Sequence, residues 1–199
     1  VSLESCQSIF PSVTKFGMAA LLPHKKLEVV QRSNGVHGIL ADGQSTEAGN
    51  RDKVLKAAHA ASVALKYDNI IGLKRADRQA LVKGMDVVYI YHDKVDEASH
   101  TSDSAVFPAC DDSITEIKNL IRIIVNEFGG TNVIVTADHG FLYTYSPLSE
   151  DDKVDKTTPT EHDVEVDRRY LITQKGAKPD YLLPVRFMGG ETEYDAFAP

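Results

Sequence analysis

An aspartate and a histidine stand side by side where a short apolar run of the sequence ends. Asp138 and His139 come after the β-branched residues 133–135, and Gly140 comes directly after them. A carboxylate and an imidazole offer an oxygen and a nitrogen ligand to one divalent metal ion. Gly140 lets the backbone turn sharply and leaves room beside the pair. The same residues could also form an ordinary turn in which the aspartate caps the next segment, so the pair alone leaves both interpretations open.

A second acid and histidine are separated by one helical turn. Asp96 and His100 are four positions apart and come after the apolar, aromatic residues 86–92. On a helix, residues at this spacing share a face, so one carboxylate and one imidazole could reach the same metal ion. The alternative is a solvated acidic loop with an incidental histidine.

Two hydroxyl residues precede a short apolar segment near the start of the chain. Residues 16–22 predict a helix that Pro23 ends, with Ser12 and Thr14 just before it. Either hydroxyl could simply cap the helix. Either could also act as a nucleophile, because the helix dipole and the free N–H groups at a helix N-terminus favour a phosphoryl oxygen.

The elements that must position these residues predict an α/β fold. Residues 86–92 and 133–137 indicate two buried strands, and residues 111–128 indicate a helix with one apolar face that ends at two glycines. The order strand, helix, strand predicts parallel strands with a right-handed crossover. We therefore expect a mostly parallel sheet flanked by helices. Both acid-and-histidine pairs should lie after strands at one edge of that sheet and share a cleft with Thr14.

The remaining segments carry weaker patterns. Residues 24–85 look less regular, although 51–65 and 75–83 are helical in pattern. Residues 168–187 suggest a hairpin of two short strands, and the residues after 189 look irregular. We expect residues 1–199 to form a single domain.

Composition limits the classes of function. Hydrophobic content of 42% and charged content of 26% are ordinary for a globular protein. The net charge of −7 argues against a surface built mainly to neutralise nucleic-acid phosphates. Basic residues near Arg75 and Arg168 keep a nucleic-acid-binding module open as a weaker hypothesis.

The two cysteines and the first residues of the sequence bear on the cellular compartment of the protein. Cys6 and Cys110 have no paired spacing, which predicts neither a disulfide framework nor a thiolate metal site and fits the cytosol. The sequence has no apolar run of transmembrane length and no visible signal peptide, so we expect a cytoplasmic protein without a membrane partner. Because it begins at Val1 in a loop-like stretch, we expect a fragment of a larger protein.

Three segments together resemble a known superfamily. Pro11-Ser12-Val13-Thr14, then Asp96-xxx-His100, then residues 136–140 occur in the order used by the alkaline phosphatase superfamily. The closer resemblance is to the PglZ domain, a component of bacterial BREX bacteriophage-exclusion systems. Residues 89–93, 135–143 and 168–170 are similar to signatures of that family, and the resemblance covers nearly the whole chain.

The resemblance implies a metal-dependent phosphoesterase with an alkaline-phosphatase-like core. Thr14 matches the hydroxyl nucleophile, with Ser12 as the weaker candidate. Two metals about 4 Å apart would stabilise the attacking and leaving oxygens of a phosphoryl displacement, and the metal beside Thr14 would favour its alkoxide. Zinc is preferred because imidazoles are among the ligands, and manganese or magnesium is the alternative. Each metal would take one acid-and-histidine pair, Asp96 with His100 and Asp138 with His139.

Two expected ligands of the superfamily have no match. An aspartate upstream of the nucleophile and a third histidine in a later His-Gly-Gly-type segment are missing, and the acidic surroundings of His162 do not fit the second. We therefore expect a partial site, and these residues alone to be a poor catalyst that holds metal weakly. The expected substrate is a phosphate mono- or diester, including nucleotides or DNA, and the expected partners are other phage-defence proteins. The alternative is a non-catalytic assembly or nucleic-acid-interaction module on the same fold.

Overall fold

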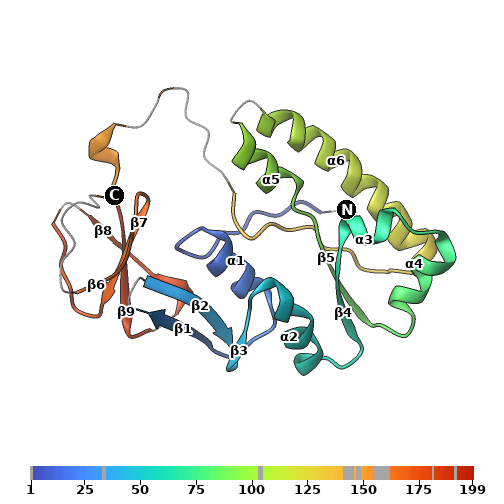
Figure 1. Ribbon diagram of the computed structural model, residues 1–199, viewed down its shortest axis with the longest axis horizontal. Helices are drawn as coiled ribbons and strands as arrows, with labels where there is room; N and C mark the ends of the chain where they lie inside the picture. The colour runs from blue at the N-terminus through green and yellow to red at the C-terminus, as the bar shows by residue number, and fades with distance from the viewer. Residues whose placement is uncertain are drawn as a thin grey trace. The chain divides into compact units, whose positions relative to one another are not determined.

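The computed structural model describes most of the chain in two compact units. The first unit comprises Val1–Val54 and Thr136–Pro199, and the second comprises Leu55–Val135. Figure 1 shows the first unit in blue and in orange to red, and the second in cyan to yellow. The described residues are 2–32, 35–102, 105–140, 146, 149–154, 162–180, 182–190 and 192–199.

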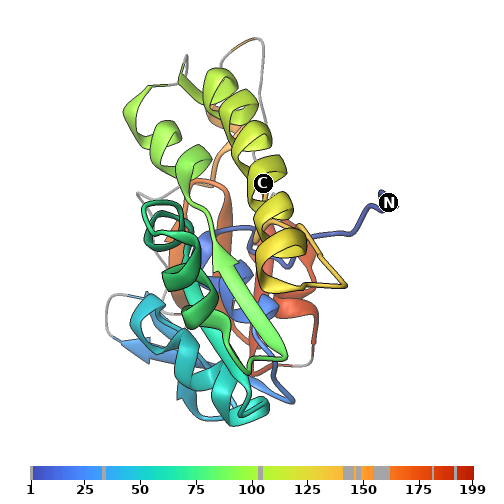
Figure 2. The ribbon, with the colours of Figure 1, turned by 90° about the vertical axis from the view of Figure 1, so that its right-hand side faces the viewer.

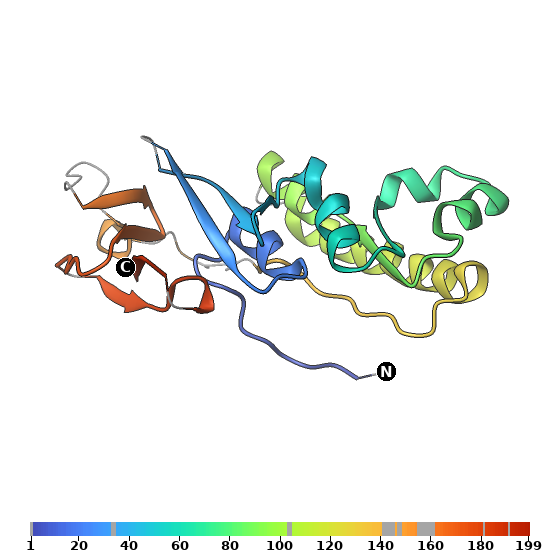
Figure 3. The ribbon, with the colours of Figure 1, turned by 90° about the horizontal axis from the view of Figure 1, so that it is seen from below.

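In the described residues of the first unit, a short helix lies beside two antiparallel sheets (Figure 3). Helix α1 spans Thr14–Leu21 and contacts β2. One sheet has the order β1-β2-β3 and the other β6-β7-β9-β8. The bounds of the strands are β1 Leu27–Arg32, β2 Gly35–Ala41, β3 Gln44–Ser45, β6 Asp163–Asp167, β7 Tyr170–Gln174, β8 Leu183–Val185 and β9 Tyr194–Ala198. Short 3-10 turns occur at η1 Ala48–Asn50, η4 Glu150–Asp152 and η5 Phe187–Gly189.

The core of the first unit forms where α1 meets both sheets. Phe16 of α1 is fully buried, and its ring meets the rings of Tyr170 and Phe187 edge to face, with centroids 6.4 and 5.7 Å apart. Ile172 of β7 and Ile39 of β2 complete the contact between the sheets. Burying these large side chains favours the packing of α1 against the sheets, at roughly 25 cal/mol per Å² of apolar surface removed from water.

The second unit is built on a parallel strand pair (Figures 1 and 2). Strands β4 and β5 are joined by two helices, and four further helical segments precede or follow them in the described residues. Asp93 N-caps α5 without a side-chain cap bond, and Gly129, at φ 72°, ends the last segment as the glycine pair in the sequence predicts. The bounds are α2 Arg51–Ala58 (which crosses from the first unit), β4 Ser62–Lys66, α3 Tyr67–Ile71, α4 Arg75–Val82, β5 Val87–Tyr91, α5 Lys94–Thr101, α6 Val106–Ile123 and the π-helical turn η3 Ile124–Phe128.

Several local predictions are confirmed. The helix expected at 16–22 is α1, the helix at 75–83 is α4, and the strand at 86–92 is β5. The helix expected at 111–128 is α6 with η3, and it starts earlier, at Val106. The mixture of helices and sheets expected of an α/β fold is therefore present. A mostly parallel sheet is not confirmed, because the described parallel sheet has two strands and the larger sheets are antiparallel.

The strand predicted at 133–137 is wrong for the described structure. These residues are extended but belong to no strand, and the side chain of Ile134 is 88% exposed. The parallel partner of β5 is β4, not this run. A strand is stabilised by a ladder of backbone hydrogen bonds to a neighbour, and without that ladder an apolar run stays in solvent.

Four other expectations are corrected. The helical pattern at 51–65 ends at residue 58, because 62–66 form β4 and pair with β5. Residues 24–85 are more regular than expected, since they contain the β1–β2 hairpin. The hairpin expected within 168–187 does not form, because β7 and β8 each pair with β9 between them. Strand β9 also replaces the irregular end expected after residue 189.

No helix in the described part of the chain is long and apolar enough to cross a membrane.

Candidate functional site

The first turn of α1 presents the hydroxyl of Thr14 to a histidine from a distant part of the chain. Thr14 Oγ1 lies 3.1 Å from His139 Nε2. The N-cap of α1 is Val13, and no side chain makes a cap bond there among the described residues. The capping interpretation of Ser12 and Thr14 is therefore wrong, and the Thr14 hydroxyl is available to the imidazole.

A backbone carbonyl determines which nitrogen of His139 carries the hydrogen. His139 Nδ1 lies 2.9 Å from the carbonyl oxygen of Gly140. A carbonyl only accepts hydrogen bonds, so in the neutral imidazole Nδ1 donates and Nε2 keeps its lone pair. That lone pair faces Thr14, so it can accept the hydroxyl hydrogen bond or bind a metal ion.

Asp138 brings its carboxylate to the same nitrogen. Its Oδ2 lies 3.6 Å from His139 Nε2, and the Asp138 and His139 side chains are 17% and 24% exposed. Adjacent ligands of a tetrahedral zinc ion bonded at about 2.1 Å are roughly 3.4 Å apart. The distances of 3.1 and 3.6 Å around His139 Nε2 are close to that spacing. This spacing is compatible with one metal ion held by Asp138 and His139 beside Thr14, and the metal site stays a prediction.

A glycine allows α1 to approach the Asp138 backbone closely. Gly17 lies one turn after Thr14 and is buried. A Cβ atom built there would overlap the carbonyl oxygen of Asp138. The helix and the Asp138 segment therefore pack backbone to backbone, and this brings the Thr14 hydroxyl within reach of His139.

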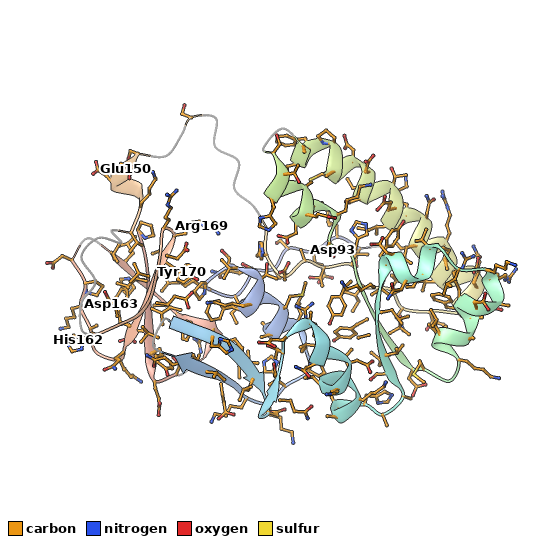
Figure 4. All side chains as sticks on the ribbon, viewed as in Figure 1. Asp93, Glu150, His162, Asp163, Arg169 and Tyr170 are labelled. Carbon is orange, nitrogen blue, oxygen red and sulfur yellow. The ribbon has the colours of Figure 1, made fainter. Side chains whose placement is uncertain are left out.

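A polar network lies beside Thr14, on the neighbouring residue Lys15. The Lys15 ammonium binds both oxygens of Glu165, at 2.6 and 2.7 Å, and the carbonyl of Val36 at 3.1 Å. Tyr170, labelled on β7 in Figure 4, donates its hydroxyl to Glu165 at 2.5 Å. Burial first, and then the Glu165 carboxylate, raises the pKa of the Tyr170 hydroxyl above its ordinary value, so Tyr170 remains a donor.

The second predicted pair lies on α5 in the second unit. Asp96 Oδ2 and His100 Nε2 are 3.7 Å apart, and the side chains are 53% and 78% exposed. The shared helical face of Asp96 and His100 is confirmed. The alternative of a loop is wrong, because the backbone there is helical. No group of three or more His, Cys, Asp and Glu side chains in the described ranges could hold a metal. We predicted that Asp96 and His100 share one cleft with Thr14, Asp138 and His139, and this stays a prediction.

The sequence alone missed a cluster at the carboxyl end of β5. His92 Nε2 lies 2.7 Å from one oxygen of Glu116 on α6, and Lys94 Nζ lies 2.6 Å from the other. Lys94 also reaches Asp112 at 3.3 Å, and the Tyr67 ring meets the His92 ring edge to face. A histidine directly after a strand was the available signal, but nothing in the sequence indicated its partner on α6.

This cluster predicts a pH-dependent contribution to stability. Hydrogen bonds from Lys94, and then from His92, lower the pKa of Glu116 below its ordinary 4.5. A lowered folded-state pKa adds stability above the unfolded value, and the gain is lost as pH falls. Glu116→Gln should therefore reduce the free energy of unfolding near pH 7, by about 1 kcal/mol or less because solvent screens the cluster.

Denaturant unfolding of wild type and variant from neutral to acidic pH tests this expectation. The difference should shrink as pH falls below 4.5. Glu97→Gln on α5 is the control. A difference that stays constant or grows in acid would contradict the stated role of Glu116.

Two other polar residues of the described chain are Arg78 and His162. Arg78, in the basic cluster near Arg75, binds both oxygens of Glu127 at 2.8 and 2.9 Å and is only 16% exposed, so it stabilises the second unit. His162 lies exposed just before β6 (Figure 4). Residues 141–143, which complete one family signature, lie outside the described residues.

Comparisons with known proteins agree with the resemblance. A family model described as the BREX system PglZ alkaline phosphatase-like domain matches residues 1–198. The alkaline phosphatase-like protein BrxZ of Escherichia coli O9:H4 (strain HS) is 36% identical over 182 residues, covering 90% of this chain and 21% of that protein. The alkaline phosphatase-like protein PglZ of Bacillus cereus (strain H3081.97) is 30% identical over 175 residues, covering 87% of this chain and 20% of that protein. The chain thus spans about a fifth of the length of these relatives. No solved structure matches it.

Proposed function

The chain belongs to the BREX system PglZ alkaline phosphatase-like domain family, and from this premise we propose that it carries part of the active site of a metal-dependent phosphoesterase. The observation that carries the proposal is the Thr14 hydroxyl, 3.1 Å from the lone pair of His139 with the Asp138 carboxylate beside it. A hydroxyl, an imidazole and a carboxylate at one point are the groups that a threonine nucleophile needs.

In this proposal each residue has a definite task. Thr14 Oγ1 would attack the phosphorus of a phosphate mono- or diester, and the P–O bond to the leaving alcohol would break as the new P–O bond forms, with the hydroxyl proton going to solvent and the leaving oxygen taking up a proton. Water would then hydrolyse the phosphothreonine, which releases the phosphate and restores the Thr14 hydroxyl. The start of α1 faces the phosphoryl oxygens with backbone N–H groups that have no partner within the helix. The Gly140 carbonyl keeps the hydrogen of His139 on Nδ1, so Nε2 keeps a lone pair that can bind a metal ion in place of the Thr14 hydroxyl hydrogen.

The donor atoms support two metal positions. Asp138 with His139 would hold one divalent ion and Asp96 with His100 the other, with the remaining ligands supplied elsewhere in the longer protein. Bound metal supplies Lewis-acid stabilisation of the phosphoryl oxygens and lowers the pKa of the nucleophile. Zinc suits the imidazole ligands best, with manganese or magnesium as alternatives. The substrate class extends to nucleotides and DNA, and the partners to other phage-defence proteins.

Metal removal from the full-length protein tests the proposal. Chelation should lower the hydrolysis of a chromogenic phosphomonoester, a chromogenic phosphodiester or an oligonucleotide by about a hundredfold or more. Adding back zinc, manganese or magnesium should restore turnover, and the preferred ester and metal would define the enzyme. Metal-loaded protein that hydrolyses none of these esters would instead favour the non-catalytic module. Turnover that survives complete metal removal would also contradict the proposal.

A further inference from the structure

The carboxylate of Glu165 joins four separate elements of the first unit. One of its oxygens accepts hydrogen bonds from Lys15 Nζ at 2.6 Å and from the Tyr170 hydroxyl at 2.5 Å. The other oxygen accepts from Lys15 Nζ at 2.7 Å and from the backbone N–H of Val36 at 2.8 Å. Its side chain is 14% exposed. One group on β6 thus connects α1, β2 and β7.

The Lys15 ammonium is fully engaged by this arrangement. An ammonium has three hydrogens to donate, and Lys15 has three acceptors: the two Glu165 oxygens and the Val36 carbonyl. Although Lys15 comes directly after the proposed nucleophile, its charge is directed at Glu165. It therefore serves to anchor the helix start and is not a free cation for the phosphate of a substrate.

The start of α1 depends on such an anchor. Among the described residues no side chain caps this helix, and Thr14 and Lys15 are its first two positions. Phe16, the third position, is packed in the apolar core. Apolar packing resists separation of the helix from the sheet but is non-directional, whereas charge-assisted hydrogen bonds also fix orientation.

We propose that Glu165 is a positioning residue that, by holding Lys15, fixes the first turn of α1 and so keeps the Thr14 hydroxyl directed at His139. The inference rests on the proposed function, since it assigns Thr14 a reaction to be positioned for. A gap of about 1 Å in the placement of a reacting group can cost on the order of a hundredfold in rate. A carboxylate that touches neither substrate nor metal can therefore control turnover.

Two kinetic variants in the full-length protein test the inference. Glu165→Gln places an amide NH₂ where one oxygen accepts from two donors, and Lys15→Met removes the ammonium at similar length. Each should lower kcat by about 10- to 100-fold while KM changes less than about threefold. Because both substitutions disrupt the same contact between Lys15 and Glu165, the kcat of the double variant should be little lower than that of either single variant. Lys26→Met breaks an exposed ion pair with Glu28 in the same unit and should leave kcat unchanged.

The same variants separate positioning from substrate binding. If Lys15 bound the phosphate, Lys15→Met would raise KM and Glu165→Gln would free the cation and lower KM. That pattern would overturn the inference. Unchanged kcat in both variants would also overturn it and would show that the packing of Phe16 alone places α1.

A structural readout makes the test independent of activity. Crystal structures of the wild-type and Glu165→Gln full-length proteins should show the distance between Thr14 Oγ1 and His139 Nε2 lengthened beyond hydrogen bonding in the variant. Tyr170→Phe removes one of the four hydrogen bonds to Glu165 and is a milder second variant, should Glu165→Gln fail to fold. A distance unchanged in the variant that folds would refute positioning. Wild-type protein without turnover would refute only the proposed function, because the measured distance would still decide the inference.

Discussion

Replacing Asp138 by alanine in the full-length protein is expected to reduce phosphoester hydrolysis by about a thousandfold or more while the protein stays folded. Asp138 Oδ2 lies 3.6 Å from His139 Nε2, and in the proposed site these two groups hold one metal ion beside the Thr14 hydroxyl. Metal-assisted chemistry fails when a ligand is lost. The apolar core around Phe16 does not include the Asp138 side chain, so folding should change little.

Steady-state kinetics, bound metal per chain and thermal unfolding together measure this effect. Thr14→Val should abolish turnover as completely, while leaving Asp138 and His139 in place to bind metal. Glu28→Ala, which removes an exposed carboxylate of the same unit, should behave as wild type. Wild-type turnover in Asp138→Ala would remove that residue from the mechanism, and global unfolding would show that its role is structural.

The substitution Gly17→Ala should be almost as damaging, although it leaves every proposed catalytic group in place. The added Cβ would overlap the carbonyl oxygen of Asp138, a backbone atom that cannot rotate away. Either α1 or the Asp138 segment must move, which separates Thr14 from His139. We expect a loss in kcat on the order of a hundredfold and destabilisation of about 1–3 kcal/mol from overpacking.

Gly38→Ala is the matched control, because a Cβ on that β2 glycine would have nothing within 4 Å. It should change neither kcat nor the midpoint of chemical unfolding appreciably. Equal effects of the two alanine substitutions would show that the close approach of α1 to Asp138 does not matter for catalysis.

Local patterns in the sequence were sufficient wherever neighbours along the chain decide the structure. The apolar periodicity of residues 111–128 predicted most of α6, because one turn of a helix is stabilised by the next. The spacing of Asp96 and His100 placed them on one helical face for the same reason. Asp138 and His139 are close together simply because they are consecutive in the sequence.

Patterns that depend on a partner were less informative. The run at 133–135 has the composition of a buried strand, but β5 pairs with β4 and the run stays extended in solvent. Composition describes what a strand could bury and does not specify which backbone will hydrogen-bond to it. The predicted hairpin at 168–187 failed likewise, because β9 enters between its two strands.

The sequence by itself determined the residue types of the candidate site, a short helix close behind Ser12 and Thr14, and the adjacency of Asp138 and His139. Tertiary structure alone decided that Thr14 meets His139 across 125 positions and that Lys15 meets Glu165 across 150. Hydrogen bonds between such distant positions form only after packing has brought the segments together, because the entropy of closing long loops must first be overcome. Glu165 therefore looked like one more charged residue in the sequence, and only the folded chain shows that its carboxylate binds the Lys15 ammonium at the start of α1.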